Sequence, residues 1–343
     1  MNKILILTFL LIVSALSAWQ PEWIRYISLE NYYDSNIQKL SSNSLDTFQA
    51  GTSPDQFRLN SSDDFLSSLR LELGVKHRYL TGHTQIAKIV IKYDHFWNNA
   101  FMDNLYLRFN LRQYFSRTVN LALNYYYYPR ILVNRYRSET DGQYHDYTYA
   151  KNVYNAALFW RFIDPATVTC KFEISQLYYN KYFTEYDCLN LENEVTLHLK
   201  PCTWFQADFA YAFRLSSADG EDAYSDPGQV QVKDASYEAN IFTISLAFPQ
   251  LLRVKDKFCR LDGSITRDIR YYQSDVTGDT YHLGRDDHFW RVSGDLSYPL
   301  LPQIRIKILT FWESRDTESP FASVIAEKDY QRYQIGLSLD LAL

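Results

Sequence analysis

The chain ends on the stretch that decides the fold: Tyr333-Gln334-Ile335-Gly336-Leu337-Ser338-Leu339-Asp340-Leu341-Ala342-Leu343. Every odd-numbered position carries a large apolar side chain, and every even-numbered position carries a polar or small one. Side chains alternate between the two faces of a β-strand, so this stretch would have one wholly apolar face. An amphipathic helix would need apolar residues three and four positions apart, and the stretch lacks them. We therefore predict a strand with one face in an apolar medium.

The same period-two pattern recurs upstream, for example in 69–75, 105–111, 119–127 and 205–213. Pattern matching gives about fourteen such segments along the chain. We therefore predict an all-β fold made of a single large sheet. The segments begin near Glu22, Phe65, Gln85, Asn104, Val119, Asn152, Val168, Cys188, Trp204, Tyr237, Phe258, His288, Ile304 and Tyr330.

The connections between these segments alternate in length. Short links such as 115–118 and 200–203 alternate with longer polar stretches such as 34–62, 129–148 and 273–286. Tight turns at one end and long loops at the other are typical of a transmembrane antiparallel up-and-down β-barrel. Three places depart from the pattern: Arg267 and Asn193 fall on the apolar face of their strands, and the first strand has no clean alternation. Bulges or an error in register would explain them.

Aromatic residues gather where the strands enter the long-loop side. The chain has 29 Tyr, 21 Phe and 7 Trp, and clusters such as Tyr32-Tyr33, Phe96-Trp97, Tyr271-Tyr272 and Phe311-Trp312 fall at that side. Amphipathic rings favour the membrane–water interface, so a girdle is expected there. Strand propensity in a soluble sandwich would explain the abundance of aromatic residues but not their placement.

The N-terminus has the pattern of an export signal. Lys3 precedes an apolar run from Ile4 to Val13, and small residues follow up to Ala18. This pattern predicts a signal peptide at 1–18 and a barrel at 19–343, with cleavage after Ser17 or after Ala18. The run is shorter than the roughly 20 residues that a spanning helix needs, although a retained N-terminal anchor is the alternative.

Charge and cysteine content exclude some functions. The formal net charge is −5, which argues against nucleic acid as a partner. Neither a metal nor another cofactor is expected. The cysteines have spacings that match no zinc or redox motif. An exported chain permits disulfides, so pairing and four isolated thiols both stay open for Cys170, Cys188, Cys202 and Cys259.

The terminal strand resembles that of porin-like bacterial outer-membrane β-barrel proteins. In that class an alternating C-terminal strand is the recognition signal for the barrel-assembly machinery, and its last residue is usually Phe, where this chain has Leu343. The resemblance implies a barrel in outer-membrane lipid, with the size of a fourteen-stranded monomeric porin. It assigns the assembly signal to Tyr333, Ile335, Leu337, Leu339, Leu341 and Leu343.

Charged residues fall on the face opposite to the apolar one, which we assign to the lumen. An unpaired charge facing lipid would cost about 2–4 kcal/mol near the midplane, so these residues should face water or one another. Odd and even positions in a strand face opposite sides, and this parity assigns each charged residue to the lumen or to the lipid. The residues assigned to the lumen include a small excess of basic ones, which predicts a weak preference for anions. The pore-lining set is Arg70, Glu72, Lys76, Lys88, Lys92, Arg108, Arg112, Glu192, Glu194, Asp208, Arg214, Arg291, Asp295, Arg305 and Lys307.

We predict a passive outer-membrane channel for small hydrophilic solutes. The alternative is a non-conducting barrel that anchors surface loops or assists surface export, with its lumen closed by ion pairs. An enzyme is not expected, because the chain has no Gly-x-Ser-x-Gly motif. A hydrolase at the rim would have to use a short Asp/His pair. The candidate pairs are Asp286 with His288, His145 with Asp146, and Asp94 with His95.

Overall fold

The computed structural model describes residues 21–79, 83–138, 141–218, 220 and 233–343. The predicted signal peptide at 1–18 lies outside these described residues. The two α-helices in the described part are α2 (Ser42–Ala50) and α3 (Ala322–Lys328), and two short 3₁₀ helices are η2 (Ala100–Met102) and η3 (Thr184–Tyr186). No helix in that part is both long and apolar enough to span a bilayer.

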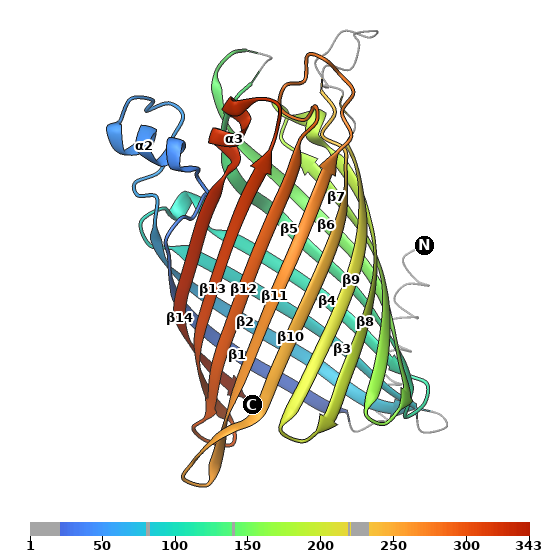
Figure 1. Ribbon diagram of the computed structural model, residues 1–343. Coiled ribbons are helices and arrows are strands. Elements are labelled where there is room, and N and C mark those ends of the chain that lie inside the picture. Colours follow the sequence, from blue (N-terminus) through green and yellow to red (C-terminus); the bar gives the residue numbers. More distant parts are fainter. Residues whose placement is uncertain (1–20, 80–82, 139–140, 219, 221–232) are drawn as a thin grey trace, which may run out of the picture.

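Fourteen antiparallel strands close into one barrel, in which each strand pairs with its neighbours in sequence and β1 pairs with β14 (Figure 1). Closure removes the free sheet edges, so the backbone groups of the first and last strands are paired too. The predicted fold class and strand number are confirmed. The strands are β1 (Glu22–Asp34), β2 (Asp64–Tyr79), β3 (His83–Phe96), β4 (Asn104–Tyr114), β5 (Val119–Arg137), β6 (Tyr144–Ile163), β7 (Ala166–Tyr179), β8 (Cys188–Cys202), β9 (Phe205–Ala218), β10 (Tyr237–Val254), β11 (Lys257–Tyr272), β12 (Asp286–Pro299), β13 (Ile304–Glu318) and β14 (Tyr330–Ala342).

The terminal strand shows how alternation produces an inside and an outside. Leu337 and Leu339 on the outer face are 59% and 48% exposed, whereas Ser338 and Asp340 on the inner face are 2% and 4% exposed. Apolar side chains therefore cover the outside of the wall, and polar side chains lie inside it. The other members of the predicted assembly signal also lie on the outer face of this strand.

The β5–β6 hairpin is longer than predicted. β5 continues to Arg137 and β6 begins at Tyr144, so most of the predicted 129–148 loop is strand. The register shifts twice within this extension, between Tyr128 and Ile131 and between Leu132 and Asn134. A bulge interrupts the alternation of faces, so the period-two pattern is lost in the part of the hairpin that extends beyond the prediction.

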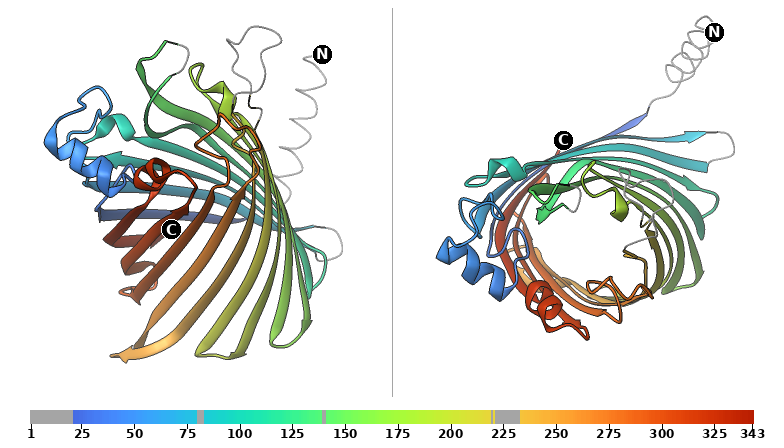
Figure 2. Two further views of the ribbon diagram at one scale, coloured as in Figure 1. Left: turned by 45° about the horizontal axis from the view of Figure 1, so that its top comes forward. Right: turned by 90° about the horizontal axis from the view of Figure 1, so that it is seen from above.

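We call the end of the barrel that carries the loops with α2 and α3 the long-connection end, and the other the short-connection end. Seen from above, α2 lies outside the ring of strands (Figure 2). Its loop is held by an apolar cluster at the long-connection end that includes Ile37, Leu40, Phe57, Phe96 and Leu132. The first long loop thus packs onto the rim as an ordered structure.

Candidate functional site

The inner wall of the barrel carries the charged side chains, because the alternation of each strand directs them there. All fifteen residues predicted to line a pore lie on the inner side of their strands. Eight of them belong to three clusters of charged side chains on different parts of the wall. Three others have separate partners: Lys76 pairs with Glu22, Asp208 with His198 and Lys307 with Asp340. Whether these residues line a conducting pore stays a prediction.

The first cluster lies on β2 and β3. The Glu72 carboxylate is shared by two cations, with Arg70 Nη2 at 2.9 Å from Oε2 and Lys88 Nζ at 2.7 Å from Oε1. Nearby, Lys92 Nζ lies 3.2 Å from Asp94 Oδ1. One carboxylate therefore serves two bases, which leaves this part of the wall with excess positive charge.

The second cluster lies on β7, β8 and β9 around Glu192. Lys171 Nζ lies 3.0 Å from Glu192 Oε1 and 2.9 Å from Glu194 Oε2, and Arg214 Nη2 lies 2.6 Å from Glu192 Oε2. Asparagines connect β4 to this cluster: Asn110 donates to Asn124 at 2.7 Å, and Asn124 donates to Asn155 at 2.7 Å. The wall between the charged clusters is thus lined with amides.

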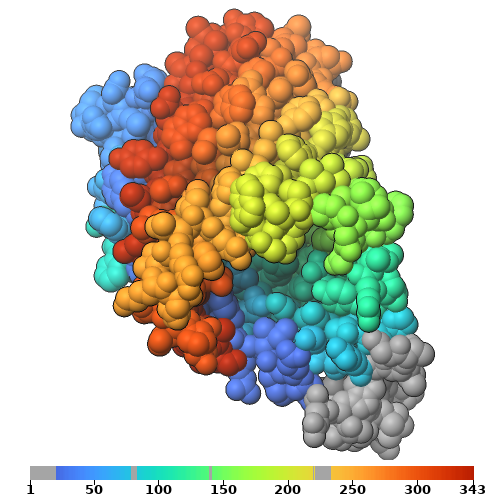
Figure 3. Space-filling model, turned by 60° about the horizontal axis from the view of Figure 1, so that its bottom comes forward, coloured from blue at the N-terminus to red at the C-terminus, as the bar shows by residue number. Residues whose placement is uncertain are grey.

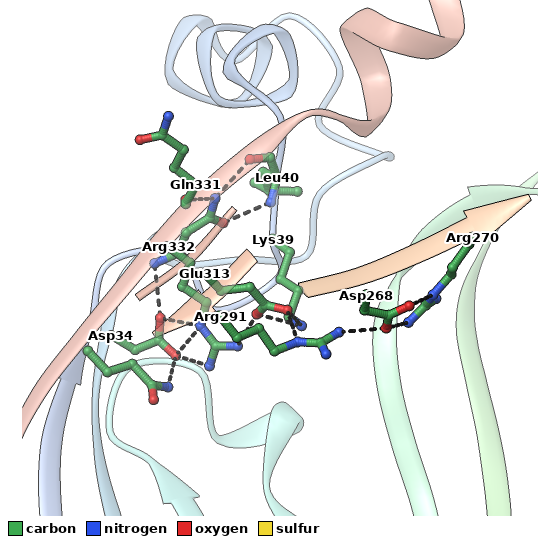
Figure 4. Close-up of polar contacts among 11 residues, drawn as sticks. Asp34, Lys39, Leu40, Asp268, Arg270, Arg291, Glu313, Gln331 and Arg332 are labelled. Carbon is green, nitrogen blue, oxygen red and sulfur yellow. Dashed lines mark hydrogen bonds and ion pairs between the residues drawn. The ribbon is translucent and has the colours of Figure 1, made fainter. Parts of the chain in front are cut away.

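The third cluster is the largest, and we call it the charge ladder (Figure 4). It begins at the closure of the barrel, where Arg332 of β14 pairs with Asp34 of β1 and Gln334 Nε2 donates to Asp34 Oδ2 at 2.8 Å. It continues through Glu313 of β13, whose Oε2 lies 2.9 Å from Lys39 Nζ and whose Oε1 lies 3.1 Å from Arg291 Nε.

The ladder ends on β11. Arg291 Nη2 reaches Asp268 Oδ2 at 3.4 Å, and Arg270 Nη2 lies 2.9 Å from the same oxygen. Arg270 also stacks on Phe289, with its Cζ 4.3 Å from the ring centroid. Counting Lys39, Arg270, Arg291 and Arg332 against Asp34, Asp268 and Glu313, the ladder has four cations and three carboxylates.

In all three clusters the bases are more exposed than the main carboxylates that they bind. Glu313 is 2% exposed, whereas Lys39 is 41% and Arg291 31% exposed. Glu192 is 7% exposed and its partner Lys171 22%. Long Lys and Arg stems carry the charge away from the wall, while the shorter carboxylates remain against it. In the first cluster and the charge ladder the more exposed charges are therefore basic, whereas in the second cluster Glu194 is 26% exposed, slightly more than Lys171.

Among the described residues, the ion pairs inside the barrel run along the inner wall and do not cross the lumen. Within the part of the chain that the structure describes, each ion pair between two of the fourteen strands joins neighbouring strands. Lys39 reaches Glu313 from the loop that follows β1. The short-connection end is hollowed, with the turns arranged around the hollow (Figure 3). A cavity of about 360 Å³ lies against β9–β13 and is lined in part by Asp208, Arg260, Asp262 and Asp295.

The two inner-wall arginines of β4 contact an amide and aromatic rings. Arg108 Nη2 donates to Asn124 Oδ1 at 3.0 Å and stacks on Tyr126, and Arg112 lies 4.3 Å from the centroid of Phe159. No carboxylate of the described residues lies within 4.0 Å of either guanidinium. Neither charge on β4 is therefore neutralised by a carboxylate of the described residues.

Sequence reasoning missed several inner-wall charges. Asp34 was missed because β1 alternates poorly, since Arg25 and Asn31 lie on its outer face and Ile24 on its inner face. Lys39 was missed because it lies in a loop, where strand parity carries no information. Its positive φ of 55° is uncommon for a residue other than glycine and belongs to the turn that brings the ammonium to Glu313.

The predicted Asp/His pairs at the rim are held by other partners. His95 Nδ1 lies 2.9 Å from Asp103, His145 Nε2 lies 2.8 Å from Asp141, and Asp94 pairs with Lys92. Asp286 and His288 share the outer face of β12. None of these three pairs therefore forms a direct carboxylate–imidazole contact among the described interactions.

A hydroxyl–imidazole–carboxylate relay lies on the inner wall. Thr169 Oγ1 lies 2.8 Å from His198 Nε2, and His198 Nδ1 lies 2.9 Å from Asp208 Oδ1. The order of groups is that of a catalytic triad. Thr169 is only 6% exposed, and it lies in mid-strand, where backbone N–H groups are engaged in the sheet and do not form an oxyanion hole. The relay is better explained as a polar contact that satisfies the buried Thr169 hydroxyl, whereas His198 and Asp208 are 35% and 45% exposed.

The remaining candidate chemistry is limited. Cys170, Cys188, Cys202 and Cys259 are all free thiols, so isolated cysteines replace the disulfide alternative. Among the described residues, no three His, Cys, Asp or Glu side chains are arranged to hold a metal ion.

Comparisons with known proteins bear on the fold alone. No family model matches the chain, and neither does any curated protein. The solved outer membrane channel DcaP of Acinetobacter baumannii matches with a TM-score of 0.50 at 9% identity, over 94% of this chain and 97% of that one. The chain shares the β-barrel fold of that protein.

Two further solved structures cover nearly the whole chain. In vitro folded OmpT, an outer membrane protein of Vibrio cholerae, matches with a TM-score of 0.49 at 9% identity, over 94% of this chain and 99% of that one. A porin structure matches with a TM-score of 0.40 at 11% identity, over 93% of this chain and 100% of that one. The barrel fold expected from the terminal strand is confirmed by the closed fourteen-strand sheet and by the match to DcaP.

Proposed function

We propose that the chain is a passive outer-membrane channel for small hydrophilic solutes, with a weak preference for anions. The observation that carries this proposal is the arrangement of ion pairs along the wall, with bases in front of carboxylates. Ion pairs that run along the wall stabilise it without bridging the lumen. A lumen closed by salt bridges would need pairs between strands on opposite sides.

The preference for anions follows from the exposed cations. Charges of one sign on low-dielectric walls focus the field in the space between them. Anions would be concentrated by Arg108 and Arg112, and by the outer members of the charge ladder, Lys39 and Arg291. The buried carboxylates weaken this field but do not reverse it, so cations should still pass.

Location and assembly belong to the same proposal. The apolar outer wall suits outer-membrane lipid, and export would use the signal peptide at 1–18. The barrel-assembly machinery would recognise β14 by its outer face, from Tyr333 to Leu343. These expectations rest on the alternation of β14 and on the apolar exposure of its outer face.

A second candidate is a non-conducting barrel that presents its loops to a partner. The observation in its favour is the order at the long-connection end, where Lys328 Nζ lies 5.1 Å from the ring centroid of Tyr136 and 5.0 Å from that of Tyr281. The end of β5, the loop after β11 and the helix after β13 thus meet at this ammonium. Recording of single channels in planar bilayers distinguishes the two candidates, because only the channel conducts.

A further inference from the structure

Arg267 is a cation on the outside of the barrel, where apolar side chains predominate. Its neighbours along β11 on the same face are Ile265, which is 50% exposed, and Ile269. The register places Arg267 opposite Trp290 of β12 on one side and Phe242 of β10 on the other. The sequence pattern had already placed it on the apolar face, so a bulge is not needed to explain it.

The position of this arginine along the strands sets its depth in the wall. Trp290 is the fifth residue of β12, near the long-connection end, and Tyr271 lies four residues beyond Arg267 on the same outer face of β11. Outward Trp and Tyr side chains near the end of a barrel strand mark the membrane–water interface, at the level of the lipid headgroups. Arg267 therefore lies near headgroup level.

The contacts of Arg267 hold it in place but leave most of its donors unused. Its Nη2 donates to His288 Nδ1 at 3.1 Å, and its Cζ lies 4.5 Å from the ring centroid of Trp290. The imidazole is held in turn by Glu318, whose Oε1 lies 3.4 Å from His288 Nε2. A guanidinium has five N–H donors in a planar fork, and only one of them has a hydrogen-bond acceptor among the described residues.

Arg267 also lacks a counter-ion of its own. No carboxylate of the described residues lies within 4.0 Å of its guanidinium, in contrast to the bases of the charge ladder. A cation on the lipid-facing wall needs an anion, and the anions at headgroup level in a membrane are phosphates. A phosphate accepts two parallel hydrogen bonds from the guanidinium fork.

We propose that Arg267, held flat on Trp290 and oriented by His288, binds the phosphate of a membrane lipid on the outer face of β10–β12. The inference rests on the proposed membrane location but not on conduction. It assigns to this part of the wall a lipid site that is separate from the inner wall.

Native mass spectrometry of the detergent-folded full chain tests the site. The probe is lipid A, compared with dephosphorylated lipid A and with inorganic phosphate. We expect the parent to retain lipid A in preference to the dephosphorylated form. Arg267→Gln should lower the affinity for lipid A about tenfold or more, because it removes charge-assisted hydrogen bonds to the phosphate. Arg267→Lys should retain part of the binding.

Arg305→Gln is the matched control, since Arg305 lies on the inner wall, and it should bind lipid A like the parent. Folding of every variant is checked by the shift in gel mobility on boiling. Equal binding of both forms of lipid A, or unchanged binding by folded Arg267→Gln, would overturn the proposal. A parent that binds inorganic phosphate but does not bind lipid A would also overturn it. Arg267→Gln should conduct normally, so failure of the lipid site is distinguishable from failure of the channel.

Discussion

Lys39 and Glu313 are 274 positions apart in sequence, yet the Lys39 ammonium lies 2.9 Å from Oε2 of Glu313. The contact joins the loop after β1 to the inner wall of β13, across the strand pair that closes the barrel. It gives the charge ladder its most exposed cation and fixes the loop against the wall.

Glu313→Ala should destabilise the barrel by about 3 kcal/mol, because Lys39, Arg291 and Arg332 would then face one another around a buried site. Lys39→Ala should cost about 1 kcal/mol or less, because its ammonium is 41% exposed and screened by water. Urea unfolding followed by tryptophan fluorescence measures both values. An equal cost for the two variants would contradict the shared role of Glu313.

Gly336 allows β14 to approach β1 closely. A Cβ at this position would lie 2.6 Å from the backbone oxygen of Asn31, whereas a Cβ at Gly263 would lie 3.7 Å from its nearest neighbour, the oxygen of Ser293. Gly336→Ala should therefore cost about 1–3 kcal/mol through overpacking, and Gly263→Ala should be nearly neutral. The same unfolding assay compares them, and equal stability of the two variants would show that the closure tolerates a side chain.

Sequence alone predicted the barrel because alternation is a local property of each strand. The strand starts at Asn104, Val119, Cys188, Tyr237 and Ile304 match the prediction, since a regular pleat continues up to the turn there. The β5–β6 hairpin was mispredicted because its bulges alter the period.

The site could be predicted only in part, because parity gives the face of a side chain but not its partner. Parity could not show that Glu192 is shared by Lys171 and Arg214, or that Lys39 enters the ladder from a loop. These contacts depend on the stagger between strands and on the path of the loop. Neither quantity is contained in a period-two pattern.

The loop between β11 and β12 should become less stable in mild acid. His282 is 7% exposed, and its Nδ1 lies 2.9 Å from Asp279 Oδ2. Burial lowers the pKa of His282 and outweighs the opposing hydrogen bond to Asp279, while the nearby cations Arg285 and Lys328 lower it further. The rings of Tyr186, Tyr272 and Tyr281 complete its surroundings.

The sign of the pH effect follows from this shift. An unfolded loop takes up a proton near the ordinary histidine pKa of about 6.5, whereas the folded loop does so only at lower pH. Stability of the loop is therefore complete above about pH 6.5 and is lost as the pH falls toward the folded pKa. Hydrogen exchange of the backbone amides of 273–285 at pH 7.5 and 5.5, corrected for intrinsic rates, measures the stability of this loop. His282→Gln should remove the difference, and equal protection of the parent at both values would refute the prediction.

Deletion of Leu341–Leu343 should prevent assembly. Leu341 is opposite Ile27, Ala342 is opposite Tyr26, and the Leu343 N–H donates to the Arg25 carbonyl at 3.0 Å, so the deletion removes part of the β1–β14 closure. Cell fractionation and gel mobility before boiling should show no folded protein in the outer membrane. Leu341→Val keeps an apolar side chain at an outward position and should assemble normally. Parental levels of the truncated protein would count against the role of this strand end.

An aqueous lumen with exposed positive charge is tested most directly by the reversal potential in a salt gradient across a planar bilayer. The parent should conduct, and its reversal potential should have the sign that a weak selectivity for anions gives. Arg108→Glu combined with Arg112→Glu should move the potential toward cations, because neither arginine has a carboxylate partner among the described residues. Arg267→Gln, on the outer face, should leave the potential unchanged. A folded parent that never conducts, or a double variant with the parental potential, would contradict the account.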